Sequence, residues 1–300
     1  MPSLSDSSAP PGAASPARAA GRSRRVPRQA GGRAIAALQW SVTLLLCAFL
    51  IVPVAMSVLA GLTVNYFRGL SSGLTLRWLE QVWQQYHGSI WLSLAVAFAT
   101  LAIVLVVGVP AGYALARSRS RSRVARVIEE ALVLPVALPG LASALALLIV
   151  YGGFTAFRMS LWFIVAGHVV FTLPFMVRAV AAVAASADLR TLEEGAASLG
   201  ASFATRFATI VLPNLRPGIV AGALAVLTLS IGEFNLTWML HTPDTKTLPV
   251  GLADTYASLR LEVGSAYTIL FLVMTLPLLV AMQWLGVDPS GTRASKRRAR

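Results

Sequence analysis

The sequence predicts an all-α fold: a polytopic membrane protein with six transmembrane helices and both termini in the cytoplasm. First, the 300-residue chain is 56% hydrophobic and only 12% charged, whereas soluble domains carry about 25% charged residues. Second, its apolar residues fall in blocks of about 20, the length that a helix needs to cross a bilayer. Third, segments rich and poor in Lys and Arg alternate along the chain, which is the pattern that sets the orientation of membrane helices.

Six apolar blocks are the predicted spans. They cover residues 38–60, 89–115, 131–151, 161–180, 217–240 and 265–286. The first block is longer than the apolar region of a cleaved signal peptide, so we expect a retained transmembrane helix at residues 36–62. We expect a periplasmic loop at 63–88, then a five-span core at 89–286 that contains a cytoplasmic loop at 181–216.

Both ends of the chain are basic tails. Residues 1–35 are rich in Pro, Ser, Ala and Arg, and they hold too little apolar surface to fold, so we predict that they are disordered. Residues 287–300 form the second basic tail.

The distribution of Lys and Arg predicts the orientation. One set of segments holds 20 of these residues: 1–35, 116–130, 178–216 and 287–300. The alternate set holds 5: 61–88, 152–160 and 241–264. Because cytoplasmic segments carry the excess of Lys and Arg, the first set is predicted to be cytoplasmic.

Charge and lysine content bear on two function classes. A net charge of +13 would suggest nucleic acid as the partner of a soluble protein. Here the basic residues lie beside apolar blocks, so we expect membrane lipids and no nucleic acid as partners.

Neither of the two lysines, Lys246 and Lys296, follows the glycine that a phosphate-binding P-loop requires. We therefore expect no ATPase site in this chain.

No catalytic or metal-binding group of residues is predicted. His87, His168 and His241 lie far apart in different segments, and Cys47 is the single cysteine, which is a poor basis for a metal site. We expect no catalytic residue, no metal and no cofactor. For His168, inside an apolar span, a hydrogen-bonded structural role is favoured over a ligand role.

Prolines interrupt several of the predicted spans. They are Pro110, Pro135, Pro139, Pro174 and Pro277. Each removes a backbone hydrogen bond and tends to kink its helix. Two interpretations remain open: kinked spans that pack well, or a bundle that lines a path and changes shape.

The cytoplasmic loop contains the stretch LEEGAASLGASFATRFATIVLPNLRP, residues 192–217. Thr191 and Glu194 match the spacing of a capping box, and Gly200 stands where a left-handed residue ends a helix. This predicts a helix of two to three turns. Ser202 is expected to start a second short helix, which Pro213 and Pro217 separate from the next span.

A helix this short needs a packing partner, because the free-energy cost of helix nucleation is not recovered in helices below about 12–15 residues. The side chains of residues 195–198 are small, so the backbone of a partner could approach closely. Docking on another protein is one interpretation, and packing on the protein's own spans is the other.

From Glu194 the loop follows the pattern E-G-A-x3-G-x9-I-x-L-P. It resembles the EAA loop in permease subunits of binding-protein-dependent ABC importers of the type I class, with Gly195 in place of the first Ala. The resemblance covers about residues 85–285 and implies a coupling helix that fits a cleft on a separate ATPase subunit, which binds the ATP. By this resemblance the docking loop is Glu194, Gly195, Ala196, Gly200, Ile210, Leu212 and Pro213. The first four would contact the ATPase, and the last three would position the hairpin.

Glu233 is the acid deepest within an apolar block, with Asn235 close behind it. It lies about 24 Å along a helix from Pro217, in the outer half of the membrane. One interpretation is that both residues line the path of a cationic substrate; the other is a structural, hydrogen-bonded acid. The stretches KTLPVGL and LVLPVALPGLASALALLIVYG resemble the subgroup of permeases for polyamines, ferric iron or aminophosphonates. Related subgroups move thiamine, sulfate and sugars.

The sequence therefore predicts a multi-pass permease subunit of an ATP-driven ABC importer in a bacterial inner membrane. It would form the translocation pathway for a small polar solute. The implied partners are ABC ATPase subunits, a second permease subunit (a homologue or an identical copy), and a periplasmic or lipid-anchored substrate-binding protein. The alternative is a secondary transporter driven by an ion gradient, but no internal repeat is evident and Glu233 is the one ionisable candidate.

Overall fold

The structure is a computed structural model that describes residues 30–118, 123–132 and 134–286. It divides into two units, Met1–Val52 and Pro53–Arg300. The described part of the first unit is the beginning of helix α1 (Ala30–Ala60), which carries the first predicted span. Residues 30–35, predicted to be disordered, extend this helix; the rest of the N-terminal tail and residues 287–300 lie outside the described residues.

The described part of the second unit is helical throughout its core and contains no β-strand, only an isolated bridge between Thr63 and Leu74. Its α-helices are α2 (Arg77–Ser118), α3 (Arg123–Ala131), α4 (Leu134–Ala137), α5 (Gly140–Tyr151), α6 (Thr155–Arg158), α7 (Leu161–Ser186), α8 (Leu189–Ser198), α9 (Phe203–Arg206), α10 (Leu212–Gly232), α11 (Asn235–Leu240), α12 (Leu248–Ala257) and α13 (Leu261–Gly286). A 3-10 helix at Gly69–Ser72 and a π-helix at Phe207–Val211 complete it. The all-α prediction is confirmed.

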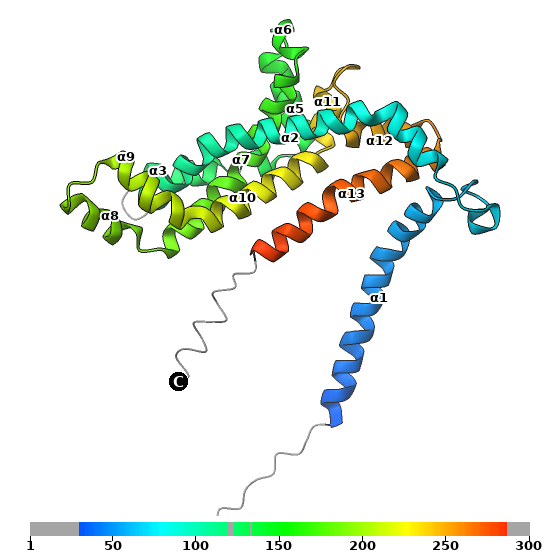
Figure 1. Ribbon diagram of the computed structural model, residues 1–300, viewed down its shortest axis with the longest axis horizontal. Coiled ribbons are helices and arrows are strands. Elements are labelled where there is room, and N and C mark those ends of the chain that lie inside the picture. The colour runs from blue at the N-terminus through cyan, green and yellow to red at the C-terminus, as the bar shows by residue number, and fades with distance from the viewer. Residues whose placement is uncertain (1–29, 119–122, 133, 287–300) are drawn as a thin grey trace, which may run out of the picture. The chain divides into compact units, whose positions relative to one another are not determined.

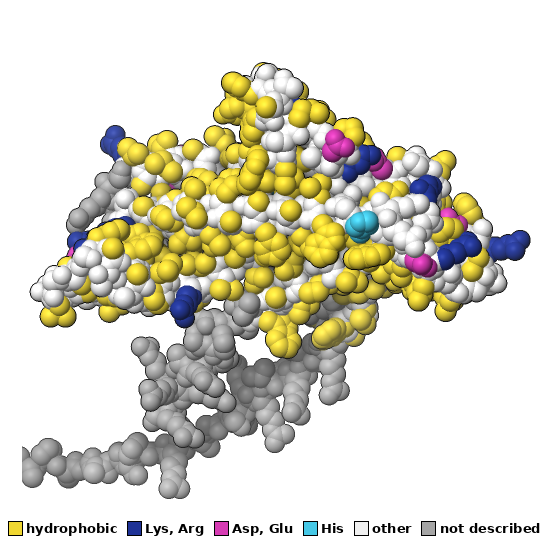
Figure 2. All heavy atoms as spheres, turned by 45° about the horizontal axis from the view of Figure 1, so that its top comes forward, with side chains coloured by type: hydrophobic (Ala, Val, Ile, Leu, Met, Phe, Trp, Pro, Cys, Tyr) yellow, Lys and Arg dark blue, Asp and Glu magenta, His cyan; other side chains and the backbone are white. Residues whose placement is uncertain are grey.

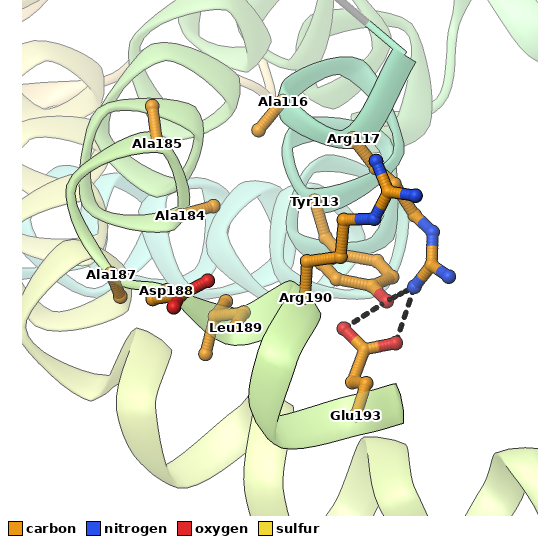
Figure 3. A pocket seen from close by; sticks show the side chains of 10 residues that line it. All are labelled: Tyr113, Ala116, Arg117, Ala184, Ala185, Ala187, Asp188, Leu189, Arg190 and Glu193. Carbon is orange, nitrogen blue, oxygen red and sulfur yellow. Dashed lines mark hydrogen bonds and ion pairs between the residues drawn. The ribbon is translucent and has the colours of Figure 1, made fainter. Parts of the chain in front are cut away.

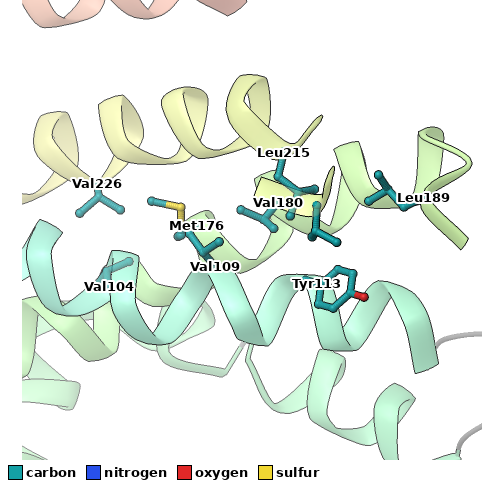
Figure 4. Close-up of a cluster of buried hydrophobic side chains, with 9 residues drawn as sticks. Val104, Val109, Tyr113, Met176, Val180, Leu189, Leu215 and Val226 are labelled. Carbon is teal, nitrogen blue, oxygen red and sulfur yellow. The ribbon is translucent and has the colours of Figure 1, made fainter. Parts of the chain in front are cut away.

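Long helices α2, α7 and α10 pack side by side, and α13 lies against α2 and α10 (Figure 1). Figure 4 shows the buried side chains that hold the first three together. We call them the α2–α7–α10 cluster: Val104, Val109, Tyr113, Met176, Val180, Leu189, Val211, Leu215 and Val226. Because lipid is as apolar as these side chains, close van der Waals packing rather than the hydrophobic effect stabilises such contacts within a bilayer.

Glycines let α2 and α10 approach the backbone of α7 from two sides. A Cβ atom at Gly112 would lie 2.8 Å from the carbonyl oxygen of Val177, and one at Gly218 would lie 2.8 Å from that of Ala179. Neither position has room for a side chain. The two glycines therefore set the spacing of the bundle that carries the candidate site.

Five described helices are long and apolar enough to cross a membrane: Ile35–Ala60, Arg77–Ser118, Leu161–Ser186, Phe203–Gly232 and Leu261–Ala281. The predicted third span is bent instead, because the helices over residues 123–137 and 140–151 meet at 104°. Pro139 stands at this bend with an extended ψ of 136°. Counting the bent pair as one span gives the six that the sequence predicts.

The structure differs from two of the predicted segments. Helix α2 begins at Arg77, inside the segment 63–88 that we expected to be a loop. Residues 77–88 are too polar to read as a span, yet Val82 is fully buried against Leu248 and Tyr267, which makes an amphipathic helix there stable. The fifth span is interrupted at residues 233–234, between α10 and α11.

The surface matches a membrane environment. On the face shown in Figure 2, hydrophobic side chains cover most of the bundle, and charged side chains lie mainly toward its two ends. Large apolar residues are exposed on the helices, such as Phe98 and Val106 on α2 and Val150 on α5. A band of this kind is stable where lipid covers it.

Candidate functional site

The segment between α7 and α10 forms a helical hairpin, α8 and α9, at one end of the long helices (Figure 1). Helix α8 starts after Asp188, whose Oδ1 accepts hydrogen bonds from the amide of Thr191 at 3.4 Å and from its hydroxyl at 3.0 Å. The predicted capping box is therefore wrong: Asp188 is the N-cap and Thr191 lies in the first turn. Asp is the stronger cap, and it stands directly after the last turn of α7, where the chain must change direction.

Helix α8 ends as predicted. Gly200 has a φ of +83°, and its amide donates to the carbonyl of Ala197 at 3.0 Å. The amide of Ala201 donates to the carbonyl of Ala196, also at 3.0 Å. This pair of bonds is a Schellman motif, which requires a left-handed residue at the position of Gly200.

The second helix of the hairpin also begins where expected, but it is not separated from the next span. The hydroxyl of Ser202 accepts from the amide of Thr205 at 3.2 Å and caps α9. The chain then continues through the π-helix directly into α10. Pro213 has no N–H and its ring would crowd the carbonyl of residue 209 in an α-helix. The π-helix lies just before Pro213, where α-helical geometry would produce this clash.

One face of α8 is packed and the other is open. Leu189 and Glu193 are buried at 4% and 2% exposure, whereas Glu194, Gly195 and Gly200 are exposed. A Cβ atom at either glycine would meet no atom within 4 Å. Packing within this chain therefore does not explain why these residues are small.

Large apolar side chains extend this open face. Leu192 is 50% exposed, Leu199 88% and Phe203 61%. Of the other predicted loop residues, Ala196 and Ile210 are half-buried, and Leu212 and Pro213 are exposed. The structure thus exposes Glu194, Gly195 and Gly200 together, whereas Ala196 is half-buried toward the packed face. The later three residues lie along the π-helix and the start of α10.

The packed face carries a residue that the sequence did not single out. Glu193 accepts a hydrogen bond from the hydroxyl of Tyr113 at 2.6 Å and forms an ion pair with Arg117 (Figure 3). Arg117 also donates to the Tyr113 hydroxyl at 2.7 Å. We call Glu193, Tyr113 and Arg117 the α8–α2 clamp.

The clamp joins the hairpin to the end of α2, on one wall of a cavity of about 210 Å³. A buried carboxylate needs such partners, because charge without them is costly in a low dielectric. The spacing of Leu189, Glu193 and Ala196 puts them on one helix face. That spacing was the available signal that Glu193, rather than Glu194, faces inward.

Glu194 makes a different contact. Its Oε1 accepts from Nε of Arg190 at 2.7 Å, and both side chains are more than 60% exposed. An exposed pair of this kind contributes little to stability, so Glu194 is available to a partner.

The predicted pathway residues lie at the interruption of the fifth span. Glu233 is half-buried, and its Oε1 accepts from the amide of Leu236 at 2.7 Å, so it caps α11. Asn235 is exposed in the first turn of that helix. The cap gives Glu233 a structural contact and leaves the pathway interpretation as a prediction.

His168 is the hydrogen-bonded structural residue that we predicted. Its ring nitrogens lie 2.7 Å from the hydroxyl of Ser230 and 2.8 Å from that of Thr237, and all three residues are buried. Among the described residues no group of His, Cys, Asp and Glu could hold a metal ion.

Fold and hairpin together define a multi-pass helical membrane protein with an open small-residue helix at one end of its bundle. Residues 108–287 match the family described as "Binding-protein-dependent transport system inner membrane component". The chain belongs to this family, and it is a permease subunit of an ABC importer. This family assignment sets aside the ion-gradient alternative.

Several relatives support the assignment. A Salmonella choleraesuis protein, PhnV, provisionally named a 2-aminoethylphosphonate transport system permease, is 30% identical over 85% of this chain and 97% of its own length. The Escherichia coli molybdenum permease ModB and spermidine/putrescine permease PotC are each 30% identical, over 57% and 50% of this chain.

A solved structure shares the fold. A chain of the MetNI methionine ABC transporter, in an inward-facing conformation, superposes with a TM-score of 0.55. It is 18% identical, and the match covers 69% of this chain and 96% of that one.

Proposed function

We propose that the α8–α9 hairpin is the docking element for a separate ATPase subunit, which binds and hydrolyses the ATP that drives import. The observation that carries this proposal is the open face of α8, where Gly195 is small although no neighbour in this chain needs it to be. Glu194, Gly195, Ala196 and Gly200 contact the ATPase. Ile210, Leu212 and Pro213 position the hairpin against the membrane.

The α8–α2 clamp gives this docking a mechanical consequence. Glu193 ties the docked helix to Tyr113 and Arg117 at the end of α2. Leu189 of α8 belongs to the α2–α7–α10 cluster. When the ATPase moves the hairpin, the ion pair and this packing draw the end of α2 along with it.

The remaining parts of the importer follow from the same assignment. A second permease subunit, either a homologue or an identical copy, encloses the pathway with this chain. A periplasmic or lipid-anchored binding protein delivers the solute. Both termini and the hairpin are proposed to lie in the cytoplasm of a bacterial cell, with the spans in its inner membrane. The basic segments 1–35, 116–130, 178–216 and 287–300 support this orientation.

The solute is proposed to be small and polar. The names of relatives include 2-aminoethylphosphonate, molybdenum and spermidine/putrescine. Of these, 2-aminoethylphosphonate, spermidine and putrescine carry an amine. Glu233 and Asn235 are the proposed pathway residues, because an ionisable group at membrane depth usually faces a cavity or a partner. An amine-bearing solute suits this carboxylate best, either a polyamine or an aminophosphonate that presents its ammonium group. Ferric iron and thiamine are the other candidates.

Substitution of Gly195 tests the docking proposal. Gly195→Ala keeps a small residue and raises the helix propensity at this position. This variant should still co-purify with the ATPase subunit. Gly195→Trp adds bulk on the open face, where it meets nothing in this chain, and should abolish co-purification while membrane insertion stays intact. Retention of the ATPase by the Trp variant would overturn the proposal.

A further inference from the structure

The interruption of the fifth span lies between two differently packed helices. Helix α10 ends at Gly232 and α11 begins at Asn235, with no proline at the break. Backbone groups at membrane depth need internal partners. Glu233 supplies one by accepting from the amide of Leu236 at 2.7 Å, and Phe234 supplies another through its carbonyl, which accepts from the amide of Trp238 at 2.7 Å.

His168 on α7 bridges this interruption. Nδ1 lies 2.7 Å from the hydroxyl of Ser230 on α10, and Nε2 lies 2.8 Å from the hydroxyl of Thr237 on α11. The exposed fractions of His168, Ser230 and Thr237 are 1%, 4% and 0%. A neutral imidazole offers one donor and one acceptor, and each hydroxyl can take either role, so both bonds form without any charge. We call these three residues the latch.

The two sides of the break belong to different packing clusters. Helix α10 packs in the α2–α7–α10 cluster, which reaches the hairpin through Leu189. Helix α11 packs in a second cluster: Val96, Ala144, Phe163, Ile164, Val165, Leu236 and Leu240. Arg158 fixes the far end of α11 by donating to the carbonyl of Leu240 at 3.0 Å.

The first residue of helix α5 lies against the same interruption of the fifth span. A Cβ atom at Gly140, the first residue of α5, would lie 3.1 Å from Cβ of Asn235 and 3.3 Å from Oε1 of Glu233. The interruptions of the third and fifth spans therefore meet. A change of angle at residues 233–234 displaces α5 as well as α11.

We propose that residues 233–234 form a hinge in the fifth span and that His168 is a positioning residue which latches it. With the latch closed, α10 and α11 move as one body, so a displacement that begins at the hairpin reaches α11, α5 and Glu233. Without the latch, α10 moves, and α11 and α5 follow its displacement only in part. The role of the latch in transport rests on the proposed function; the hinge itself does not.

Hydrogen exchange on the purified permease in nanodiscs tests the hinge. Ser230→Ala and Thr237→Val each remove one hydroxyl of the latch, and His168→Leu removes both bonds. Exchange of the peptide over 234–241 should rise about fivefold for each single hydroxyl, which is the size expected for one net hydrogen bond. His168→Gln keeps a donor and an acceptor and should exchange more slowly than His168→Leu.

Thr172→Val is the matched control. It removes a fully buried hydroxyl from the same helix, one that bonds the backbone carbonyl of His168 at 2.7 Å and not its ring. Exchange over 234–241 should stay at the wild-type rate. Equal rates in the latch variants and the wild type, or the same increase in Thr172→Val, would overturn the hinge.

A second measurement tests the role in transport. In the importer reconstituted with its ATPase and binding protein, the latch variants should import several-fold less solute for each ATP hydrolysed, and Thr172→Val should not. Faster exchange with an unchanged ratio would overturn the positioning role. If the wild-type permease engages no ATPase, the proposed function fails, while exchange on the permease alone still decides the hinge.

Discussion

The carboxylate of Glu193 on α8 is paired with the guanidinium of Arg117 at the end of α2, 76 positions away in the sequence. The pair is asymmetric, because the side chain of Glu193 is 3% exposed and that of Arg117 is 50% exposed. The acid is fixed within the fold, and the base remains accessible beside it. This contact makes the short helix of the hairpin part of the bundle rather than a free loop.

Glu193→Ala should lower the stability of the permease by about 1–3 kcal/mol, because it leaves the Tyr113 hydroxyl and Arg117 without their shared acceptor; the exposure of Arg117 keeps the effect below that of a fully buried pair. Thermal unfolding in detergent measures it. Glu194→Ala, one position along, should change stability by less than about 0.5 kcal/mol. Equal losses in the two variants would contradict the inward role of Glu193.

Asp188→Ala should loosen the first turn of α8, since loss of an N-cap costs about 1 kcal/mol. Hydrogen exchange of the peptide that covers 188–194 should become faster, and Asp188→Asn should restore much of the protection, because an Asn side chain also accepts the Thr191 amide. Thr191→Val should have a smaller effect than Asp188→Ala. The reverse order would favour the capping box that the sequence suggested.

Gly200→Glu should abolish uptake while the protein still inserts into the membrane, because it places a charged side chain on the open docking face. Gly73→Glu is the control: Gly73 also has a positive φ, +88°, and also meets nothing within 4 Å, but it lies in the loop before α2. Uptake and membrane insertion are measured side by side. Loss of uptake in both variants would point to backbone strain instead of docking.

Glu233→Gln separates the two roles of this residue. The amide oxygen of Gln can still cap α11 by accepting from Leu236, but the negative charge is gone. We expect thermal stability to stay close to wild type and uptake of an amine-bearing solute to fall at least about tenfold, the change that 1.4 kcal/mol of lost binding would cause. Unchanged uptake would show that Glu233 serves only as a cap.

Local signals in the sequence were enough to predict much of the hairpin. Gly200 and Ser202 act through bonds to residues within five positions, so their roles are visible in the pattern itself. The cap of α8 was misassigned because Thr191 and Asp188 both fit local rules. The end of α7 decided between them, and that boundary depends on packing.

Long-range features could not be predicted in the same way. The inward direction of Glu193 depends on Tyr113 and Arg117, which only the folded bundle brings close. No proline in the sequence marks the interruption after Gly232. It is stabilised by the hydrogen bonds of His168 with the hydroxyls of Ser230 and Thr237 and by the hydrogen bond from the amide of Leu236 to Glu233. Helix α2 begins at Arg77, before the apolar block, because Val82 is buried against residues that are distant in the sequence.

Photocrosslinking is the most direct test of the central claim, that the open face of the hairpin docks an ATPase subunit. A benzoylphenylalanine residue replaces Leu199, which is 88% exposed beside Gly200, or, as the control, Phe67, which is 84% exposed in the loop before α2. After irradiation of the assembled importer, the probe at position 199 should join the permease to the ATPase subunit, and the probe at 67 should not. An intact complex with no crosslink from position 199, or with equal crosslinks from both positions, would contradict the account.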